Sequence, residues 1–108
     1  MTLPLLARSR VDQVSVECAA SGVDPAVLQA LAGKDVMVGV IDVGDEAIET
    51  PEIVASRIRA ALRHVPAERL LPSTDCGLVP RSRASAVGKM RVLAEGAKQV
   101  RLELATRR

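Results

Sequence analysis

The chain has 108 residues, the length of one domain or of one part of a larger domain. Hydrophobic residues make up 48% of it and none is aromatic, so its core must be built from Val, Leu, Ile, Ala and Met. The net charge of +2, the lack of aromatic stacking groups and the lack of a long apolar run argue against nucleic-acid and membrane partners.

Three apolar segments are predicted to be strands. The first, residues 12–20, carries Val14 and Val16 on one face. The second, residues 36–42, is a nearly continuous apolar run of the kind found in strands that are covered on both faces, as in parallel sheets. The third begins at Leu70 and ends at the Asp-Cys-Gly turn of residues 75–77.

A helix is predicted after each strand. Asp24 and Pro25 are an N-cap and a first helical residue for a short helix over residues 26–31. Thr-Pro-Glu at residues 50–52 starts a second helix, whose apolar spacing continues as far as His64. A last helix is predicted over residues 83–104, with apolar residues at spacings of three and four: Val87, Met90, Leu93, Ala94, Ala97, Val100 and Leu104.

This alternation of strands and helices predicts an α/β protein with right-handed crossovers and a parallel sheet. Three parallel strands leave two unpaired edges that need cover. The sheet is therefore either a compact open sheet or part of a barrel whose other strands lie elsewhere.

This topology predicts that several reactive side chains lie at the carboxyl ends of the strands. Parallel strands end on one side of the sheet, where ligands bind in such folds. Glu17, Asp42 and Cys76 stand at or near these ends, so we expect them to come together. Because side chains alternate along a strand, Cys18 should face away from Glu17 and pack behind it.

Cys76 has two alternative roles, a small buried hydrophobic residue or a thiolate that binds a metal. Its polar turn, followed by the positive start of a helix, favours the thiolate. No secretory signal is recognised, so the expected compartment is the reducing cytoplasm, where the two cysteines would not form a disulfide. A redox or nucleophilic role is disfavoured, because no histidine or second cysteine has an obvious place beside Cys76.

Other polar residues have simpler explanations. Asp42 could merely cap the loop that follows it, and His64 is expected at the opposite end of the sheet, facing solvent. The arginines at positions 57, 59 and 63 are expected to form a solvated helix face. Glu17 and Cys76 alone make a weak metal signal, since zinc takes three or four protein ligands.

Several motifs occur in order along the chain: V-G-V-I-D-V, E-T-P-E-x-V-A-x-R-I-R-A-A-L, H-V-P-A-E-R-L, D-C-G-L and K-x-R-x-L-x-E-G-A-K-x-V-R. Over residues 11–104 the sequence resembles the C-terminal end of the cobalamin-independent methionine synthase family, and most nearly its short, single-barrel members. The resemblance implies part of a (β/α)8 TIM barrel, with residues 1–108 as its last three βα units.

The resemblance also implies a zinc site. In the family a histidine and a cysteine from one motif, a strand-end glutamate and the cysteine of D-C-G bind zinc; the last two match Glu17 and Cys76. In the family, the zinc binds homocysteine as a thiolate, which attacks the methyl group of 5-methyltetrahydrofolate, used as its polyglutamate (triglutamate) form. For short members of the family, a methylated corrinoid protein is an alternative methyl donor. The upstream histidine and cysteine are not in this sequence, so we expect weak zinc binding and no turnover by this chain alone.

A second hypothesis is a non-catalytic α/β module. Its exposed sheet edges would pair with a second copy or with a partner chain, including one that supplies the N-terminal part of the barrel. Zinc content and mass in solution separate these hypotheses.

Overall fold

The computed structural model describes residues 8–19, 25–31, 33–78 and 81–106. Three strands form one parallel sheet: β1 (Gln13–Glu17), β2 (Asp35–Ile41) and β3 (Leu70–Thr74). Their order in the sheet is β1-β2-β3, with β2 in the centre. The predicted parallel α/β arrangement is confirmed, although β1 and β3 end before the predicted limits.

Helical segments connect the strands. A 3-10 helix, η1 (Pro25–Leu31), takes the place of the first predicted helix, and the N-cap predicted at Asp24 lies outside the described residues. Helix α2 (Pro51–Leu62) begins as predicted, with the Ile53 amide donating to the Thr50 hydroxyl at 3.2 Å. A 3-10 turn, η2 (Ala67–Arg69), leads into β3.

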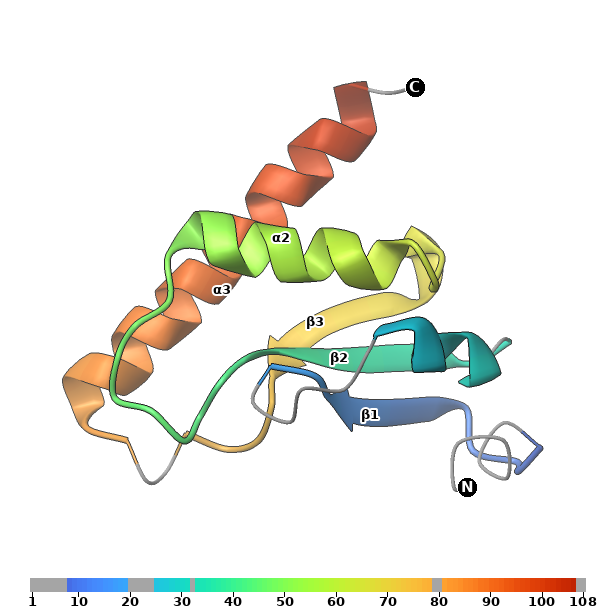
Figure 1. Ribbon diagram of the computed structural model, residues 1–108, viewed down its shortest axis with the longest axis horizontal. Helices are drawn as coiled ribbons and strands as arrows, with labels where there is room; N and C mark the ends of the chain where they lie inside the picture. The colour runs from blue at the N-terminus through green and yellow to red at the C-terminus, as the bar shows by residue number, and fades with distance from the viewer. Residues whose placement is uncertain (1–7, 20–24, 32, 79–80, 107–108) are drawn as a thin grey trace.

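Helix α3 (Arg83–Thr106) is the longest element and packs across α2 on the same side of the sheet (Figure 1). Its predicted apolar stripe is only partly buried. Ala97 and Val100 of the stripe face the core, together with Val92, which the prediction did not include, whereas Val87 and Met90 are 46% and 61% exposed. Met90, Leu93 and Ala94 of the stripe instead line a groove with Leu71 and Pro72 of β3.

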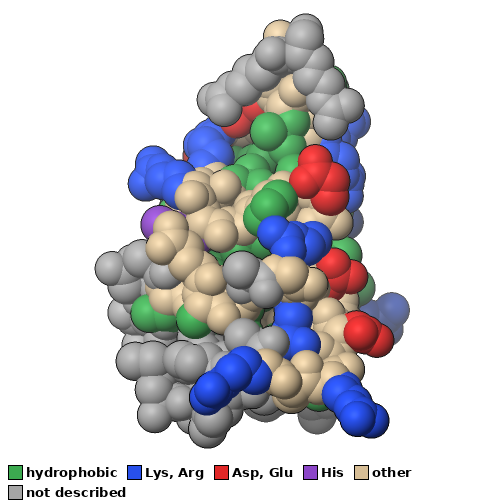
Figure 2. Space-filling view, turned by 90° about the vertical axis from the view of Figure 1, so that its right-hand side faces the viewer, with side chains coloured by type: hydrophobic (Ala, Val, Ile, Leu, Met, Phe, Trp, Pro, Cys, Tyr) green, Lys and Arg blue, Asp and Glu red, His purple; other side chains and the backbone are tan. Residues whose placement is uncertain are grey.

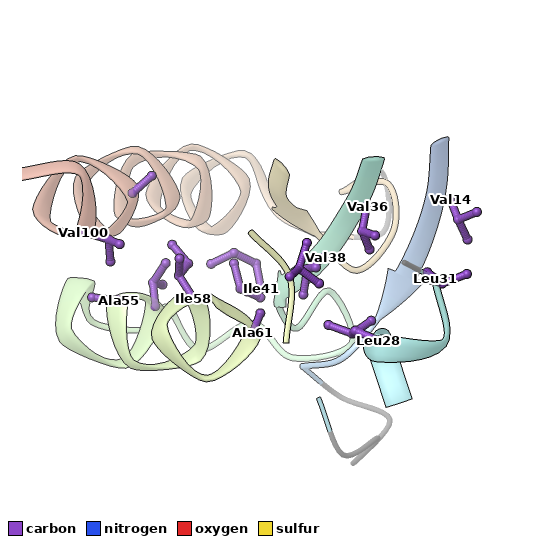
Figure 3. Packing of buried hydrophobic residues seen from close by; sticks show 14 of the residues in the cluster. Val14, Leu28, Leu31, Val36, Val38, Ile41, Ala55, Ile58, Ala61 and Val100 are labelled. Atoms are coloured by element: carbon purple, nitrogen blue, oxygen red, sulfur yellow. The ribbon is translucent and has the colours of Figure 1, made fainter. Parts of the chain in front are cut away.

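The core lies between the sheet and its helices, where only aliphatic side chains meet (Figure 3). The central strand contributes most, because Val36, Val38 and Ile41 are almost completely buried. Ile58 and Ala61 of α2 pack against them. The continuous apolar run of β2 therefore has the buried position that its sequence predicts.

Sequential strand order with the long helices on one side is the arrangement of a (β/α)8 barrel segment. The chain thus has the fold of three βα units of a TIM barrel. Figure 2 views the side at which the strands begin and shows hydrophobic side chains between charged ones. No helix among the described residues is long and apolar enough to cross a membrane.

Candidate functional site

The carboxyl edge, where β1, β2 and β3 end, carries both predicted metal ligands. Glu17 is the last residue of β1 and is exposed, and the exposed Cys76 follows the end of β3 by two residues. Strand register aligns Glu17 with Gly39 and Gly39 with Ser73, three residues before Cys76. The topology therefore places a carboxylate and a thiol at one edge, although they are 59 positions apart in sequence.

Asp75 links the three strand ends at this edge. It is only 7% exposed, and its backbone amide donates to the carbonyl of Ile41 at 2.9 Å. Its Oδ1 accepts a hydrogen bond from the amide of Ala19 at 3.1 Å. The carboxylate passes over Gly39, where an added Cβ would lie 2.1 Å from Oδ1. The neighbour of Cys76 thus reaches the segment just after Glu17.

Cys18 behaves as the alternation of side chains predicts. It is half-buried against the hydrophobic core, whereas Glu17 is exposed. Burial raises the pKa of the Cys18 thiol, and the nearby Asp75 charge raises it further. A thiol held protonated in this way is a poor metal ligand or nucleophile.

Loop 42–50, between β2 and α2, is organised by carboxylates. Asp42 caps the loop, since its Oδ1 accepts from the Gly44 amide at 2.8 Å. Glu49 folds back so that its Oε2 accepts from the Asp42 amide at 2.8 Å. The capping role predicted as the alternative for Asp42 is therefore the one that the structure supports.

Glu49 is also the centre of a polar cluster, which we call the Glu49 cluster: Glu49 and Lys89, which are buried, and the partly exposed Arg57. Lys89 is fully buried and donates to Glu49 Oε1 at 2.9 Å and to the Ala47 carbonyl at 2.7 Å. Arg57 donates to the Val40 carbonyl at 2.8 Å and to Glu49 Oε2 at 3.3 Å. These contacts fix loop 42–50 against α2 and α3.

A second set of contacts joins the same loop to the start of α3. The Glu46 carboxylate accepts from the Ser82 amide at 2.9 Å and from its hydroxyl at 2.8 Å. The Ser85 hydroxyl donates to the Glu46 carbonyl at 2.8 Å, and Arg81 forms an ion pair with Glu46 at 3.3 Å. Hydrogen bonds from Ser82 lower the pKa of Glu46.

Two expectations for the arginines of α2 are wrong. Arg57 belongs to the Glu49 cluster, and Arg59 Nε donates to Glu103 Oε2 on α3 at 2.9 Å, so neither forms part of a merely solvated face. Arg63 is exposed as expected. His64 lies at the opposite end of the sheet as predicted, but it is half-buried and its Nδ1 is 2.9 Å from Gln29 Nε2.

The donor chemistry of Glu17 and Cys76 suits zinc, which binds carboxylate oxygen and thiolate sulfur. Their number does not complete a site. Among the described residues, no group of three or more His, Cys, Asp or Glu side chains is placed to hold a metal ion. The pair can therefore serve as part of a zinc site only if further ligands come from elsewhere.

Residues 1–99 match the family model described as the catalytic domain of cobalamin-independent synthase. The chain is 39% identical over 103 residues to a methionine synthase of Saccharolobus islandicus, covering 94% of this chain and 31% of that protein. It is 52% identical over 67 residues to 2-hydroxypropyl-CoM lyase of Xanthobacter autotrophicus, covering 62% of this chain and 18% of the lyase.

A solved structure is similar as well. The B12-independent methionine synthase of Shewanella sp. W3-18-1, in complex with selenomethionine, is 44% identical to this chain with a TM-score of 0.94. The match covers 96% of this chain and 30% of that one. The chain therefore spans less than a third of the length of each of these three proteins.

Proposed function

The chain belongs to the family of cobalamin-independent synthase catalytic domains, and from that premise we propose that it supplies the last three βα units of a zinc-dependent methyltransferase. The reaction would move a methyl group from 5-methyltetrahydrofolate to the sulfur of homocysteine. Glu17 and Cys76 would be two of the protein ligands of the zinc ion. A zinc ion bound there would favour the thiolate form of the substrate.

One observation carries this proposal: an exposed carboxylate and an exposed thiol lie at the carboxyl edge of a TIM-barrel sheet. In barrels of this kind the catalytic residues lie at that edge. Rigid elements support both, because the ends of β1 and β3 are tied through Asp75 and the next loop is fixed by the Glu49 cluster. The chain's own role would be to hold the two ligands in place.

Zinc titration of the purified chain tests the ligand assignment. We expect weak binding, because zinc usually takes four ligands and the described residues contain no group of three or more His, Cys, Asp or Glu side chains placed to hold it. Glu17→Gln and Cys76→Ser should each abolish it, and Cys18→Ser should leave it unchanged because the Cys18 thiol is half-buried and kept protonated. Equal binding by wild type and both ligand variants would contradict the assignment.

Methyl transfer is tested by complementation. A methionine synthase of the family, shortened by the segment that this chain matches, is mixed with the chain, and methionine formation from homocysteine and methyltetrahydrofolate is measured. We expect activity only in the mixture, and none when the chain carries Cys76→Ser. The Cys18→Ser chain serves as the matched control, and its failure to complement would point to misassembly instead of a lost ligand.

A second candidate substrate follows from the 52% identity to 2-hydroxypropyl-CoM lyase. The substrate would then be 2-hydroxypropyl-CoM, the sulfur compound in that relative's name, in place of homocysteine, with the same edge residues. Offering the complemented enzyme homocysteine with methyltetrahydrofolate in one assay and 2-hydroxypropyl-CoM in another separates the two candidates, since only the true substrate should be consumed.

Association through the sheet edge is the other candidate function. Beside edge strand β3 lies an apolar groove where Leu71 and Met90 are 44% and 61% exposed. Its lining residues are Leu71, Pro72, Met90, Leu93, Ala94, Ala97 and Arg101. An exposed apolar patch beside a strand with one unpaired edge favours association with another chain.

Sedimentation of the chain, alone and with the shortened synthase, tests this association. Met90→Lys should weaken assembly, whereas Leu102→Lys should not, because Leu102 is equally exposed on α3 but does not line the groove. A chain that stays monomeric in both conditions would exclude association through this edge.

A further inference from the structure

Asp75 lies in the turn after β3 and makes hydrogen bonds to residues near the ends of the two other strands. Its amide donates to Ile41 of β2, and its carboxylate accepts from Ala19 beyond the end of β1. It is 7% exposed and follows β3 directly, so a single buried residue spans all three strand ends. Burial of an acidic side chain is unfavourable unless hydrogen bonds satisfy it, so its placement here requires these contacts.

Gly39 makes the crossing possible. A Cβ at this position would lie 2.1 Å from Asp75 Oδ1 and 2.9 Å from Asp75 Cα, so every other residue type would displace Asp75. The pairing of β2 with β3 shifts between Gly39 and Ile41, which is where the chain of β3 turns toward Asp75. Such irregularities re-aim neighbouring side chains and are frequent beside functional sites.

The two predicted ligands flank this contact. Cys76 is bonded to Asp75, and Glu17 stands two residues before Ala19, whose amide Asp75 binds. We propose that Asp75 is a positioning residue that fixes the distance between Glu17 and Cys76, and that Gly39 is required for it to do so. The inference rests on the proposed function only for the identity of the two ligands.

Spin labels measure that distance without a metal. One label is attached to Cys76 and one to a cysteine introduced by Glu17→Cys, in a Cys18→Ser background. The parent should give one narrow spin–spin distance. Asp75→Ala should replace it with a broad distribution, whereas Asp75→Asn should keep it, because the amide oxygen still accepts from Ala19. Gly39→Ala should broaden it while leaving the carboxylate present.

The control is Asp45→Ala, which removes a comparable bond in loop 42–50, where the Ala47 amide donates to Asp45 Oδ1 at 3.0 Å. It should leave the distance unchanged. A narrow distance in Asp75→Ala with only a lower melting temperature would show a merely stabilising role and overturn the proposal. A broad distribution in the folded parent would overturn it even if Asp75→Ala does not fold.

Cobalt(II), added to chains with Glu17 and Cys76 intact, links the distance to binding. Asp75→Ala should weaken cobalt binding about 10-fold, as expected for a residue that orients metal ligands. Asp75→Asn should retain the cobalt–thiolate absorption of the parent. If the parent binds no cobalt, the ligand assignment fails for this chain, while the spin-label distances still decide whether Asp75 positions the two strand ends.

Discussion

Two sets of polar residues near the carboxyl edge differ in how they meet solvent. Glu17 and Cys76 are exposed and occupy strand ends, whereas Lys89 and Glu49 have side chains that are 0% and 9% exposed. The Glu49 cluster is satisfied from within: Lys89 and Arg57 each donate to the Glu49 carboxylate and to one backbone carbonyl, and the carboxylate also accepts from the Asp42 amide.

This difference in burial distinguishes residues that stabilise the fold from residues that can bind a ligand. A buried ion pair must be satisfied inside the protein, because an uncompensated buried charge is strongly destabilising. A ligand-binding pair must instead keep donor atoms accessible and contribute little to stability. The two sets should therefore respond oppositely to substitution, with stability lost in the cluster and binding lost at the edge.

Lys89→Met should give the largest effect. The variant leaves the buried Glu49 carboxylate without its lysine, and such losses cost about 3 kcal/mol or more. Chemical denaturation should show this decrease in the free energy of unfolding, with a fall in melting temperature of more than ~10 °C. Lys98→Met on the same helix, where Lys98 is exposed, should change stability by less than about 0.5 kcal/mol.

A double substitution checks that the Lys89 effect comes from Glu49. Lys89→Met with Glu49→Gln removes both charges, so the double variant should lose clearly less stability than the sum of the single losses. Additive losses would mean that Lys89 acts through packing alone, and the distinction between cluster and edge would then rest on burial only.

The fold could be predicted because its signals are local. The Val-rich run of β2 and the Thr50-Pro51 helix start each lie within a few residues, and both predictions are confirmed. The 3-10 geometry of η1 could not be predicted from the proline and apolar spacing, since a segment this short fits either helix.

The polar contacts near the carboxyl edge could not be predicted, because the residues that form them are far apart in sequence. Lysines on surface helices normally face solvent, so the burial of Lys89 is not expected from its sequence. Its partner Glu49 is 40 residues away. The sequence shows Asp75 only as the neighbour of Cys76, because its bond to Ala19 spans 56 residues. The one local signal was Gly39, a glycine inside an apolar strand, which often marks close approach of another backbone.

Glu49→Gln should have an intermediate effect that depends on pH. Burial alone would raise the pKa of Glu49, but hydrogen bonds from Lys89 and the Asp42 amide, with the Lys89 charge, leave it below the usual 4.5. A lowered folded-state pKa means that the ionised carboxylate adds stability above about pH 4.5, and that this stability is lost as pH falls through the folded-state pKa.

Unfolding measurements at neutral and acidic pH test this dependence. At pH 7 the Glu49→Gln variant should be less stable than wild type by about 2 kcal/mol, the range for hydrogen bonds to a charged group. The difference should shrink as the pH is lowered below 4.5. A constant difference across this range would show that the charge of Glu49 does not stabilise the fold.

Cys76→Ser should have the smallest effect on stability, because the side chain is exposed and the hydrogen bond recorded at this residue, from the Thr74 hydroxyl, goes to its backbone carbonyl. We expect a change within about 0.5 kcal/mol in the absence of metal. Zinc at ten times its dissociation constant should then stabilise wild type by about 1.4 kcal/mol and leave the variant unchanged. Equal stabilisation of both proteins by zinc would mean that the metal binds outside the carboxyl edge. A strong loss of stability in metal-free Cys76→Ser would mean that Cys76 is a structural residue, as the residues of the Glu49 cluster are.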